Sequence, residues 1–425
     1  MPASLLFSVL FVAALLAGLG LRFWLLSRQV RHVARHRHAV PEAFAQTITL
    51  AAHQKAADYT LAKARFSLLE MSWGAALLLG WTLLGGLDMV NRLLLQAMGP
   101  GLLQQLALLA AFALIASLLE LPFSLWQTFR LEQRFGFNKM SPRLWLTDAL
   151  KSMALGAALG LPLAAAILWL MAQAGSLWWL WAWFTLVGWL LLVQFIYPAW
   201  IAPLFNRFEP LQDKTLEAHV TALMQRCGFA AKGLFVMDGS RRSAHANAYF
   251  TGFGRNKRVV FFDTLLRQLS TGEVEAVLAH ELGHFKHRHI VKRLALSFAL
   301  SLAGLALLGW LSGQSWFYTG LGVQPSLSSG NEALALMLFM LAMPVFTFFL
   351  SPLLAQGSRR DEFEADAYAV AQTRGQDLAS ALLKLYEDNA STLTPDPVYV
   401  RFYYSHPPAS ERLARMRQHA AVQPA

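Results

Sequence analysis

Long apolar stretches alternate with short polar segments along most of this chain. A helix needs about 20 consecutive apolar residues to cross a hydrocarbon layer of roughly 30 Å. Seven stretches are long and apolar enough, and they cover residues 5–26, 68–87, 103–126, 150–171, 177–197, 294–311 and 334–354. The pattern therefore predicts a mainly α-helical, polytopic membrane protein with seven transmembrane helices.

The amino-acid composition agrees with this interpretation. Of the 425 residues, 56% are hydrophobic and only 14% are charged, and the mean hydropathy is +0.41. These values exclude an ordinary soluble protein and predict that a lipid bilayer surrounds most of the chain. The single cysteine, Cys227, excludes an internal disulfide framework and a cysteine-rich zinc site.

The distribution of basic residues predicts the membrane topology. A net charge of +11 can indicate a nucleic-acid partner, but here Lys and Arg gather after the first, third and fifth apolar stretches. The loops on the other side carry only Arg92. Because basic loops stay in the cytoplasm, we expect the N-terminus outside, residues 206–293 and the C-terminus in the cytoplasm, and no nucleic-acid partner.

The sequence His280-Glu281-Leu282-Gly283-His284 lies in a segment that is typical of a helix. Histidines four residues apart share one helix face, where both imidazoles can bind one metal ion. Glu281 lies to one side, where it can take the proton of a metal-bound water. Two surface histidines can produce the same pattern, so the prediction of a catalytic zinc site depends on a third ligand.

An acidic segment directly after the last apolar stretch offers that ligand. Asp361, Glu362 and Glu364 are all candidates, because a catalytic zinc ion with two histidines takes one carboxylate and keeps a position for water. Glu362 and Asp366 are four residues apart on one helical face. One of these two could bind zinc while the other orients a ligand histidine through its free ring nitrogen.

Two further segments can contribute to the site. Residues 233–266 are typical of short strands in a small antiparallel sheet, and an edge strand there could hydrogen-bond an extended peptide. His245 and Asn247 alternate along this segment and give it one polar face. His406 lies in a Ser-His-Pro-Pro turn before a helix that begins near Ala409. A His or Arg in such a turn could stabilise the oxyanion of a tetrahedral intermediate.

Seven blocks of sequence carry a resemblance to a known family. They are FGFNK (135–139), YPAWIAPLFNRFEPL (197–211), DGSRRSAHANAYFTGFG (238–254), FDTLL (262–266), LAHELGHFKHRH (278–289), SRRDEFEAD (358–366) and YYSHPPASER (403–412). With these blocks in this order, the chain closely resembles the type I CAAX prenyl endopeptidases, which are integral-membrane zinc metalloproteases of the gluzincin kind. Its short loops and Ala-, Leu- and Trp-rich composition are typical of a bacterial member, so we expect a bacterial inner membrane.

The resemblance implies a fold and a set of residue roles. The fold has seven spans around a large water-filled chamber, which Glu70 and Glu120 would face, and a small α+β zinc metalloprotease domain at its cytoplasmic end. One Zn²⁺ per chain is implied. The roles implied are zinc binding by His280, His284 and Glu362, general-base catalysis by Glu281, orientation of a ligand by Asp366, substrate contacts by His245, Asn247 and Tyr249, and stabilisation of the transition-state oxygen by His406 and Arg412.

These expectations divide the chain into four parts. Residues 1–205 would hold helices one to five with basic cytoplasmic loops, and residues 206–293 the protease segment with the small sheet and the HELGH helix. Residues 294–354 would hold helices six and seven. Residues 355–425 would form a cytoplasmic C-terminal segment with the third zinc ligand and the SHPP motif.

The leading hypothesis is a membrane-embedded zinc metalloendopeptidase that acts as a monomer on a peptide or protein, with or without a prenyl group. The eukaryotic members remove the C-terminal tripeptide of prenylated CAAX proteins. Two alternatives stay open, a quality-control protease for misfolded membrane proteins and a non-catalytic factor that holds lipidated or stalled chains. The presence of Glu281 and of a ligand set that leaves room for water favours catalysis.

Overall fold

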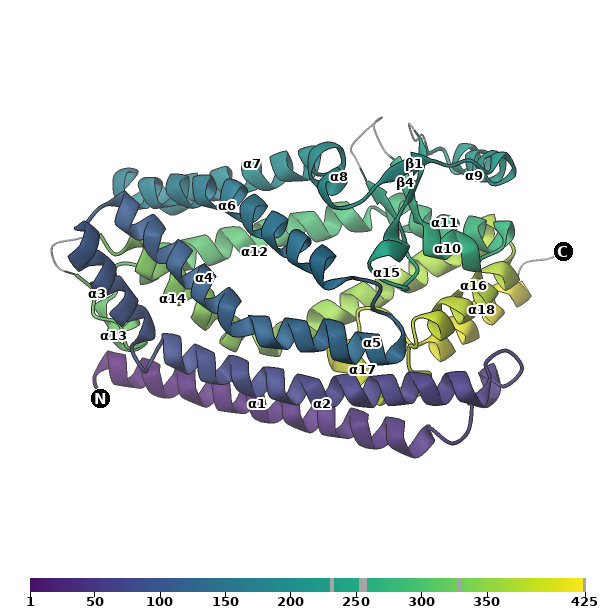
Figure 1. The fold of residues 1–425 in the computed structure, drawn as a ribbon, viewed down its shortest axis with the longest axis horizontal. Coiled ribbons are helices and arrows are strands. Elements are labelled where there is room, and N and C mark those ends of the chain that lie inside the picture. Colours follow the sequence, from purple (N-terminus) through teal and green to yellow (C-terminus); the bar gives the residue numbers. More distant parts are fainter. Residues whose placement is uncertain (230–232, 252–257, 327–329, 423–425) are drawn as a thin grey trace.

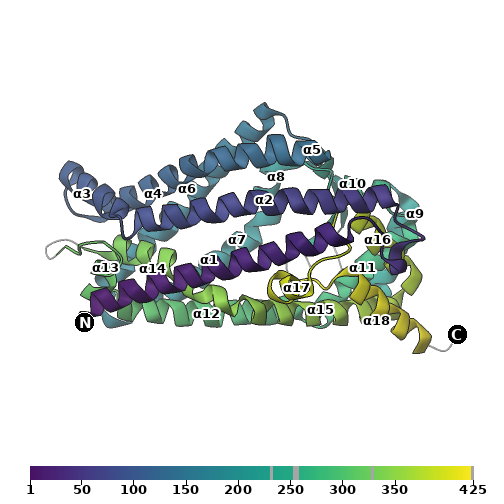
Figure 2. The ribbon, with the colours of Figure 1, turned by 90° about the horizontal axis from the view of Figure 1, so that it is seen from below.

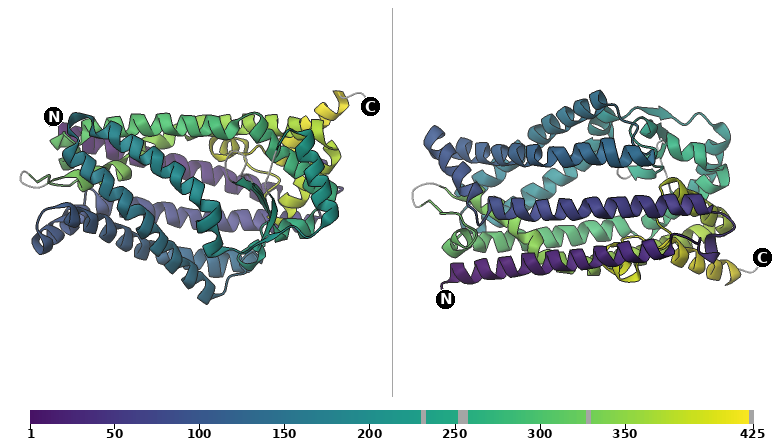
Figure 3. Two further views of the ribbon diagram at one scale, coloured as in Figure 1. Left: turned by 90° about the horizontal axis from the view of Figure 1, so that it is seen from above. Right: turned by 60° about the horizontal axis from the view of Figure 1, so that its bottom comes forward.

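The computed structural model describes residues 1–229, 233–251, 258–326 and 330–422. The sequence block over 238–254 lies outside these residues from position 252 onward. Long helices run side by side along the longest axis of the molecule (Figure 1). The strands gather at the end opposite to the N-terminus, as the turned views also show (Figure 2 and Figure 3).

Six helical segments of the described chain are long and apolar enough to span a membrane, and a bent pair of helices would make a seventh. The segments contain α1 (Ala3–His36), α4 (Leu102–Trp126), α6 (Pro142–Gln173), α7 (Trp178–Ile196), α12 (His289–Leu311) and α14 (Glu332–Thr347). The pair consists of α2 (Leu50–Trp81) and α3 (Gly86–Met98), which are bent by 46°. The predicted span over 68–87 crosses this bend, where Gly85 has a φ of 78° that favours glycine.

The remaining helices connect the spans or pack around the strands. They are α5 (Gln133–Phe135), α8 (Ala202–Phe205), α9 (Lys214–Arg226), α10 (Asp263–Gln268), α11 (Thr271–Lys286), α13 (Ser315–Thr319), α15 (Ser351–Gln372), α16 (Gly375–Asp388), α17 (Pro397–Tyr403) and α18 (Ala409–Val422). Side-chain caps fix several of their starts. Ser270 and Glu273 form a reciprocal capping box at α11, and Asp396 accepts two backbone N–H groups at α17.

The strands form one small sheet in the order β1-β2-β4-β3. They are β1 (Phe208–Pro210), β2 (Leu234–Met237), β3 (Ala248–Thr251) and β4 (Arg258–Phe262). The prediction of an antiparallel sheet is wrong for its centre, because β2 pairs with β4 in parallel while the two outer pairs are antiparallel. Strand β3 pairs with β4 alone among the described strands, so it lies at an edge of the sheet.

The sheet and the polar helices share a hydrophobic core that is separate from the core among the long helices. Its fully buried members include Val220 of α9, Phe261 of β4, Ala276 of α11 and Ala381 of α16. Burial of one large apolar side chain stabilises the fold by about 1.5–3 kcal/mol. Helix α11 is therefore held by neighbours on several sides, which fixes the position of the HELGH residues that it carries.

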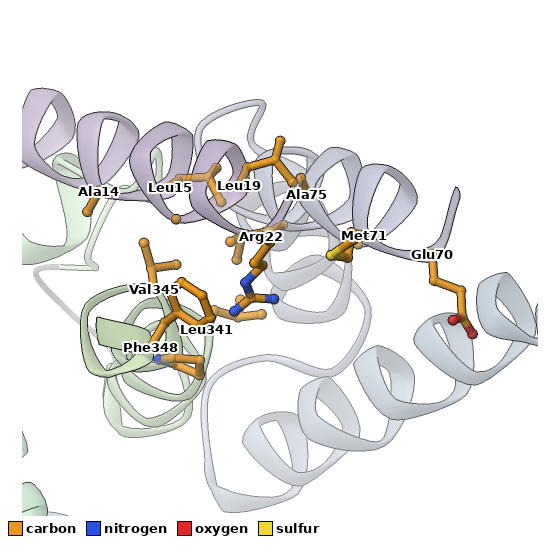
Figure 4. Close-up of a pocket in the computed structure, with 14 residues that line it drawn as sticks. Ala14, Leu15, Leu19, Arg22, Glu70, Met71, Ala75, Leu341, Val345 and Phe348 are labelled. Atoms are coloured by element: carbon orange, nitrogen blue, oxygen red, sulfur yellow. The ribbon is translucent and has the colours of Figure 1, made fainter. Parts of the chain in front are cut away.

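A cavity of about 350 Å³ lies between α1, α2 and the end of α14 (Figure 4). Its lining is mainly apolar, and Arg22 lies on the wall with its guanidinium carbon 4.1 Å from the ring centre of Phe348. Glu70 also lies on the wall, but its carboxylate points away from Arg22 (Figure 4). Glu120, the other carboxylate that the resemblance places at a chamber, is exposed on α4.

Candidate metal centre

His280 and His284 of α11 form a compact cluster with Glu362 of α15. One candidate ligand atom from each of the three residues lies within 4.8 Å of the others. The Nε2 atoms of the two histidines are 3.3 Å apart. The Glu362 carboxylate lies 3.4 Å from His280 Nε2 and 3.3 Å from His284 Nε2. Two helices that are distant in the sequence thus bring three potential metal ligands together.

The donor set fits a tetrahedral metal ion. Ligand atoms about 2.0–2.1 Å from a tetrahedral zinc ion lie roughly 3.4 Å from one another, which is close to the distances in the cluster. Glu362 Oε2 is buried and has no hydrogen-bond partner in the described part of the chain. Because an unpaired buried carboxylate oxygen is costly, a cation between Glu362 and the histidines would relieve that cost.

The structure separates the three acidic candidates for the third ligand. Asp361 pairs with Arg293 at 2.9 Å. Glu364 lies 3.1 Å from His289. Of the three, Glu362 is the one whose carboxylate joins the two histidines of the HELGH motif. Among the three acidic residues, the geometry therefore favours Glu362 as the candidate third ligand.

Asp366 lies directly behind the cluster and holds His280. Its Oδ1 is 2.9 Å from His280 Nδ1, so Nε2 of that ring is left to face the cluster. Arg412 of α18 donates two hydrogen bonds to Asp366, at 2.8 Å from Nε and 2.6 Å from Nη2. Burial alone would lower the pKa of His280, but its hydrogen bond with Asp366 and the Glu362 carboxylate 3.4 Å from its Nε2 raise that pKa to about 9. A metal ion that binds here must therefore displace a proton.

His406 connects the cluster to a cavity of about 770 Å³. Its Nε2 lies 3.4 Å from Glu362 Oε1, and its side chain is 65% exposed. His245 and Asn247 line the same cavity. Glu281 follows His280 on α11 and is partly buried. The cavity can therefore admit a molecule that reaches the ligand cluster from the side of His406.

The predicted substrate residues occupy different surroundings. His245 Nδ1 lies 2.9 Å from Asn389 Oδ1, and its ring stacks on Phe137 at 4.4 Å between ring centres. Asn247 is exposed, and its backbone carbonyl accepts from β4 just before β3 begins. Tyr249 of β3 is not among the residues that line the large cavity, and its hydroxyl lies 3.9 Å from the sulfur of Met237. The structure thus brings His245 and Asn247 to the cavity with His406, and directs Tyr249 elsewhere.

Comparison with known proteins identifies the family. Residues 29–207 match the family model of the CAAX prenyl protease N-terminal domain with five membrane helices, and residues 210–420 match peptidase family M48. CAAX prenyl protease 1 of Saccharomyces cerevisiae is 36% identical over 327 residues, which cover 74% of this chain and 72% of that protein. The chain belongs to the CAAX prenyl protease 1 family.

Other members match the chain almost from end to end. The human CAAX prenyl protease 1 homolog is 32% identical over 467 aligned residues, which cover 96% of each chain. The crystal structure of S. mikatae Ste24p superposes with a TM-score of 0.91 at 31% identity, covering 98% of this chain and 99% of that one. Family membership makes this protein an integral-membrane metalloendopeptidase with a catalytic metal, which acts on peptide or protein substrates.

Two sets of contacts around the cluster are not predicted by local sequence patterns. The Nδ1 atoms of His284 and His289 are 3.0 Å apart, although the residues are five positions apart in the sequence and a regular helix would place them on different faces. The resemblance places Arg412 near the reacting oxygen, whereas its guanidinium is bound to Asp366 on the far side of His280. The only sequence signal for either residue is its presence in a block shared with the family.

Proposed function

We propose that this family member is a zinc-dependent endopeptidase in which His280, His284 and Glu362 hold one Zn²⁺. The proposal depends on the distances between the three donor groups, which are 3.3–3.4 Å. These distances match the roughly 3.4 Å between neighbouring ligands of a tetrahedral zinc ion. A bound zinc ion would polarise the scissile carbonyl and lower the pKa of a water molecule. The unpaired Oε2 of Glu362 supports a cation at this position.

Four residues near the cluster have the catalytic and positioning roles. Glu281 accepts the proton of the attacking water and returns it to the leaving amine. His406, exposed to the cavity beside Glu362, donates a hydrogen bond to the oxygen that becomes negatively charged. Asp366 keeps His280 in the tautomer whose Nε2 binds metal, and Arg412 fixes Asp366 through two hydrogen bonds. We assign Arg412 this positioning role in place of a contact with the reacting oxygen.

The substrate binds in the 770 Å³ cavity as an extended chain. Strand β3 lies at the sheet edge, and the segment before it leads through Asn247 and His245 along the cavity wall. An extended peptide can therefore hydrogen-bond to this segment as an additional strand. His245 is itself bound to Asn389 and Phe137, which supports a role in shaping the wall.

The relatives suggest the substrate class and the membrane topology. They carry the name CAAX prenyl protease 1, so we propose a prenylated C-terminal peptide as the preferred substrate, with a protein or peptide chain as the general one. We propose a monomer in the inner membrane of a bacterium, with the N-terminus outside and the metal centre in the cytoplasm, because basic loops favour that side. The four-part division at 205, 293 and 354 follows the same topology.

The decisive experiment uses the full-length protein purified in detergent. Bound zinc is measured, and cleavage of a farnesylated CAAX peptide is compared with that of the same peptide without the farnesyl group and of an unfolded membrane protein. The expected result is about one zinc per chain, cleavage of the farnesylated peptide, loss of cleavage with a chelator, and a Glu281→Ala variant that keeps zinc but loses turnover. Preferential cleavage of the unfolded protein would assign a quality-control role, and a Glu281→Ala variant with full activity would contradict the catalytic role.

A further inference from the structure

His284 has a series of hydrogen bonds behind it, as His280 has with Asp366 and Arg412. His284 Nδ1 lies 3.0 Å from His289 Nδ1. His289 Nε2 lies 3.1 Å from Glu364 Oε2 and 3.6 Å from Asp361 Oδ1. The His289 side chain is only 1% exposed. A buried imidazole thus links one of the three candidate metal ligands to a carboxylate on α15.

The protons in this series of hydrogen bonds can be assigned from its contacts. If His284 binds a metal through Nε2, its ring proton is on Nδ1 and is donated to the nearest acceptor. That acceptor is His289 Nδ1, so His289 carries its own proton on Nε2 and donates it to Glu364. Every donor then faces an acceptor, and neither ring needs a positive charge. This assignment leaves the lone pair of His284 Nε2 free to face the cluster.

The backbone at the end of α11 is shaped to bring His289 to this position. Helix α11 ends at Lys286, and α12 begins at His289 itself. Between them Arg288 has a φ of 56°, a left-handed conformation that is uncommon for a residue with a side chain. This turn reverses the chain enough for His289 to reach back to His284. A continuous helix would have carried His289 away from the ligand face.

We propose that His289 and Glu364 position His284, as Asp366 positions His280. The pair fixes the tautomer and the orientation of the second histidine and strengthens Nε2 as a metal ligand. The two supports differ in their surroundings, because Asp366 is buried and bound by Arg412 whereas the Glu364 side chain is 42% exposed. Loss of His289 should therefore have a larger effect than loss of the Glu364 charge. The inference rests on the proposed zinc site.

Zinc affinity of the full-length protein in detergent tests the inference independently of proteolysis. We expect His289→Ala to weaken zinc binding by about 10- to 100-fold in competition with a chelator. His289→Asn keeps an acceptor near the position of Nδ1 and should recover most of the affinity, and Glu364→Gln should weaken it by less than about tenfold. The visible spectrum of the cobalt-substituted protein should shift in His289→Ala, because the geometry of a ligand changes.

His287→Ala is the matched control. Its side chain is 41% exposed, lies 3.9 Å from the same Glu364 and stacks beside His289, whereas the Nδ1 of His284 is bound to His289. We expect unchanged zinc affinity in this variant. Asp366→Asn is the positive control, because it removes the charge behind the other ligand and should weaken binding.

Three outcomes would contradict one proposal or both. Wild-type zinc affinity and an unshifted cobalt spectrum in His289→Ala, together with weaker binding in Asp366→Asn, would overturn the role of His289 and leave the zinc site intact. If His289→Ala does not fold, His289→Leu fills the same space without a hydrogen-bond acceptor, and wild-type zinc affinity with an unshifted cobalt spectrum in that variant would overturn it. A wild-type protein that binds no zinc would overturn the proposed function as well.

Discussion

Gly283 of α11 packs directly against the backbone of Ala365 of α15. A methyl group on Gly283 would lie 2.9 Å from Ala365 Cα and 3.0 Å from its carbonyl oxygen, which is closer than packed atoms approach. Gly283 lies between His280 and His284 in the sequence of α11, and Ala365 follows Glu362 by three residues in α15, so this close approach of the two helices limits the distance between the candidate ligands. The glycine of the HELGH sequence therefore has a packing role as well as a place in the motif.

We expect Gly283→Ala to push α11 and α15 apart and to move Glu362 away from the histidines. Zinc affinity should fall at least about tenfold, and peptide cleavage should fall with it, because a displacement of about 1 Å at a catalytic site can cost 100-fold in rate. Zinc titration and a cleavage assay on the purified protein would measure both effects. Gly357→Ala on α15 is the control, since nothing lies within 4 Å of its added methyl group. Equal zinc affinity in the two variants would show that the close contact does not set the site.

Sequence patterns alone predict the membrane helices and the position of His280 and His284 on one face of a helix. Both follow from local spacing, the length of an apolar stretch and the four-residue period of a helix face. The choice of Glu362 over Asp361 and Glu364 does not follow from local spacing, because a short acidic segment does not reveal which face of α15 meets α11. Its position depends on the packing of Gly283 against Ala365, a contact between helices that are distant in the sequence.

The other differences from prediction have similar physical causes. The parallel pairing of β2 with β4 joins strands of only four and five residues, which carry little pattern of their own. His289 reaches His284 only because the helix breaks at Arg288, a residue with no sequence signal for a left-handed conformation. Contacts that depend on a helix break or on tertiary packing were therefore not accessible from local spacing.

Arg412 can be tested as a positioning residue through Asp366. Arg412→Lys keeps the positive charge but loses the two-pronged hydrogen bond, so the orientation of Asp366 and His280 should loosen. We expect zinc affinity to fall by about tenfold and kcat at saturating zinc to change much less. Arg417→Lys, five residues further along α18 and exposed, is the control. A fall in kcat with unchanged zinc affinity would instead support a contact with the reacting oxygen.

Zinc affinity should depend on pH in a defined direction. The pKa of His280 is raised to about 9 in the absence of metal, because its hydrogen bond with Asp366 and the nearby Glu362 carboxylate outweigh its burial. Below that pH the imidazole holds a proton that zinc must displace, so affinity should rise about tenfold per pH unit from this residue and level off near pH 9. Calorimetry in buffers with different ionisation enthalpies would count the proton released. Zinc binding without proton release at pH 7 would contradict the assignment.

The start of α11 depends on the ionised form of Glu273. This buried carboxylate accepts hydrogen bonds from Lys384 at 2.7 Å, from Ser380 at 2.6 Å and from the backbone of Ser270 at 2.7 Å. Burial alone would raise the pKa of Glu273, but these hydrogen bonds hold it below its ordinary value. Because the folded pKa is lowered, the stabilisation is complete above the pKa of the unfolded chain and is lost as pH falls through the folded pKa.

We therefore expect Lys384→Met to lower the stability of the protein at pH 7 by about 1–2 kcal/mol, a range reduced because Lys384 is 42% exposed. Thermal unfolding in detergent should show a lower midpoint for this variant. The difference from wild type should shrink as the pH falls below the ordinary range of Glu and Glu273 becomes protonated. Lys214→Met removes an exposed pair with Glu217 and should leave the midpoint unchanged. A difference between Lys384→Met and wild type that stays constant down to acidic pH would mean that packing of the Lys384 stem, not its charge, stabilises the start of α11.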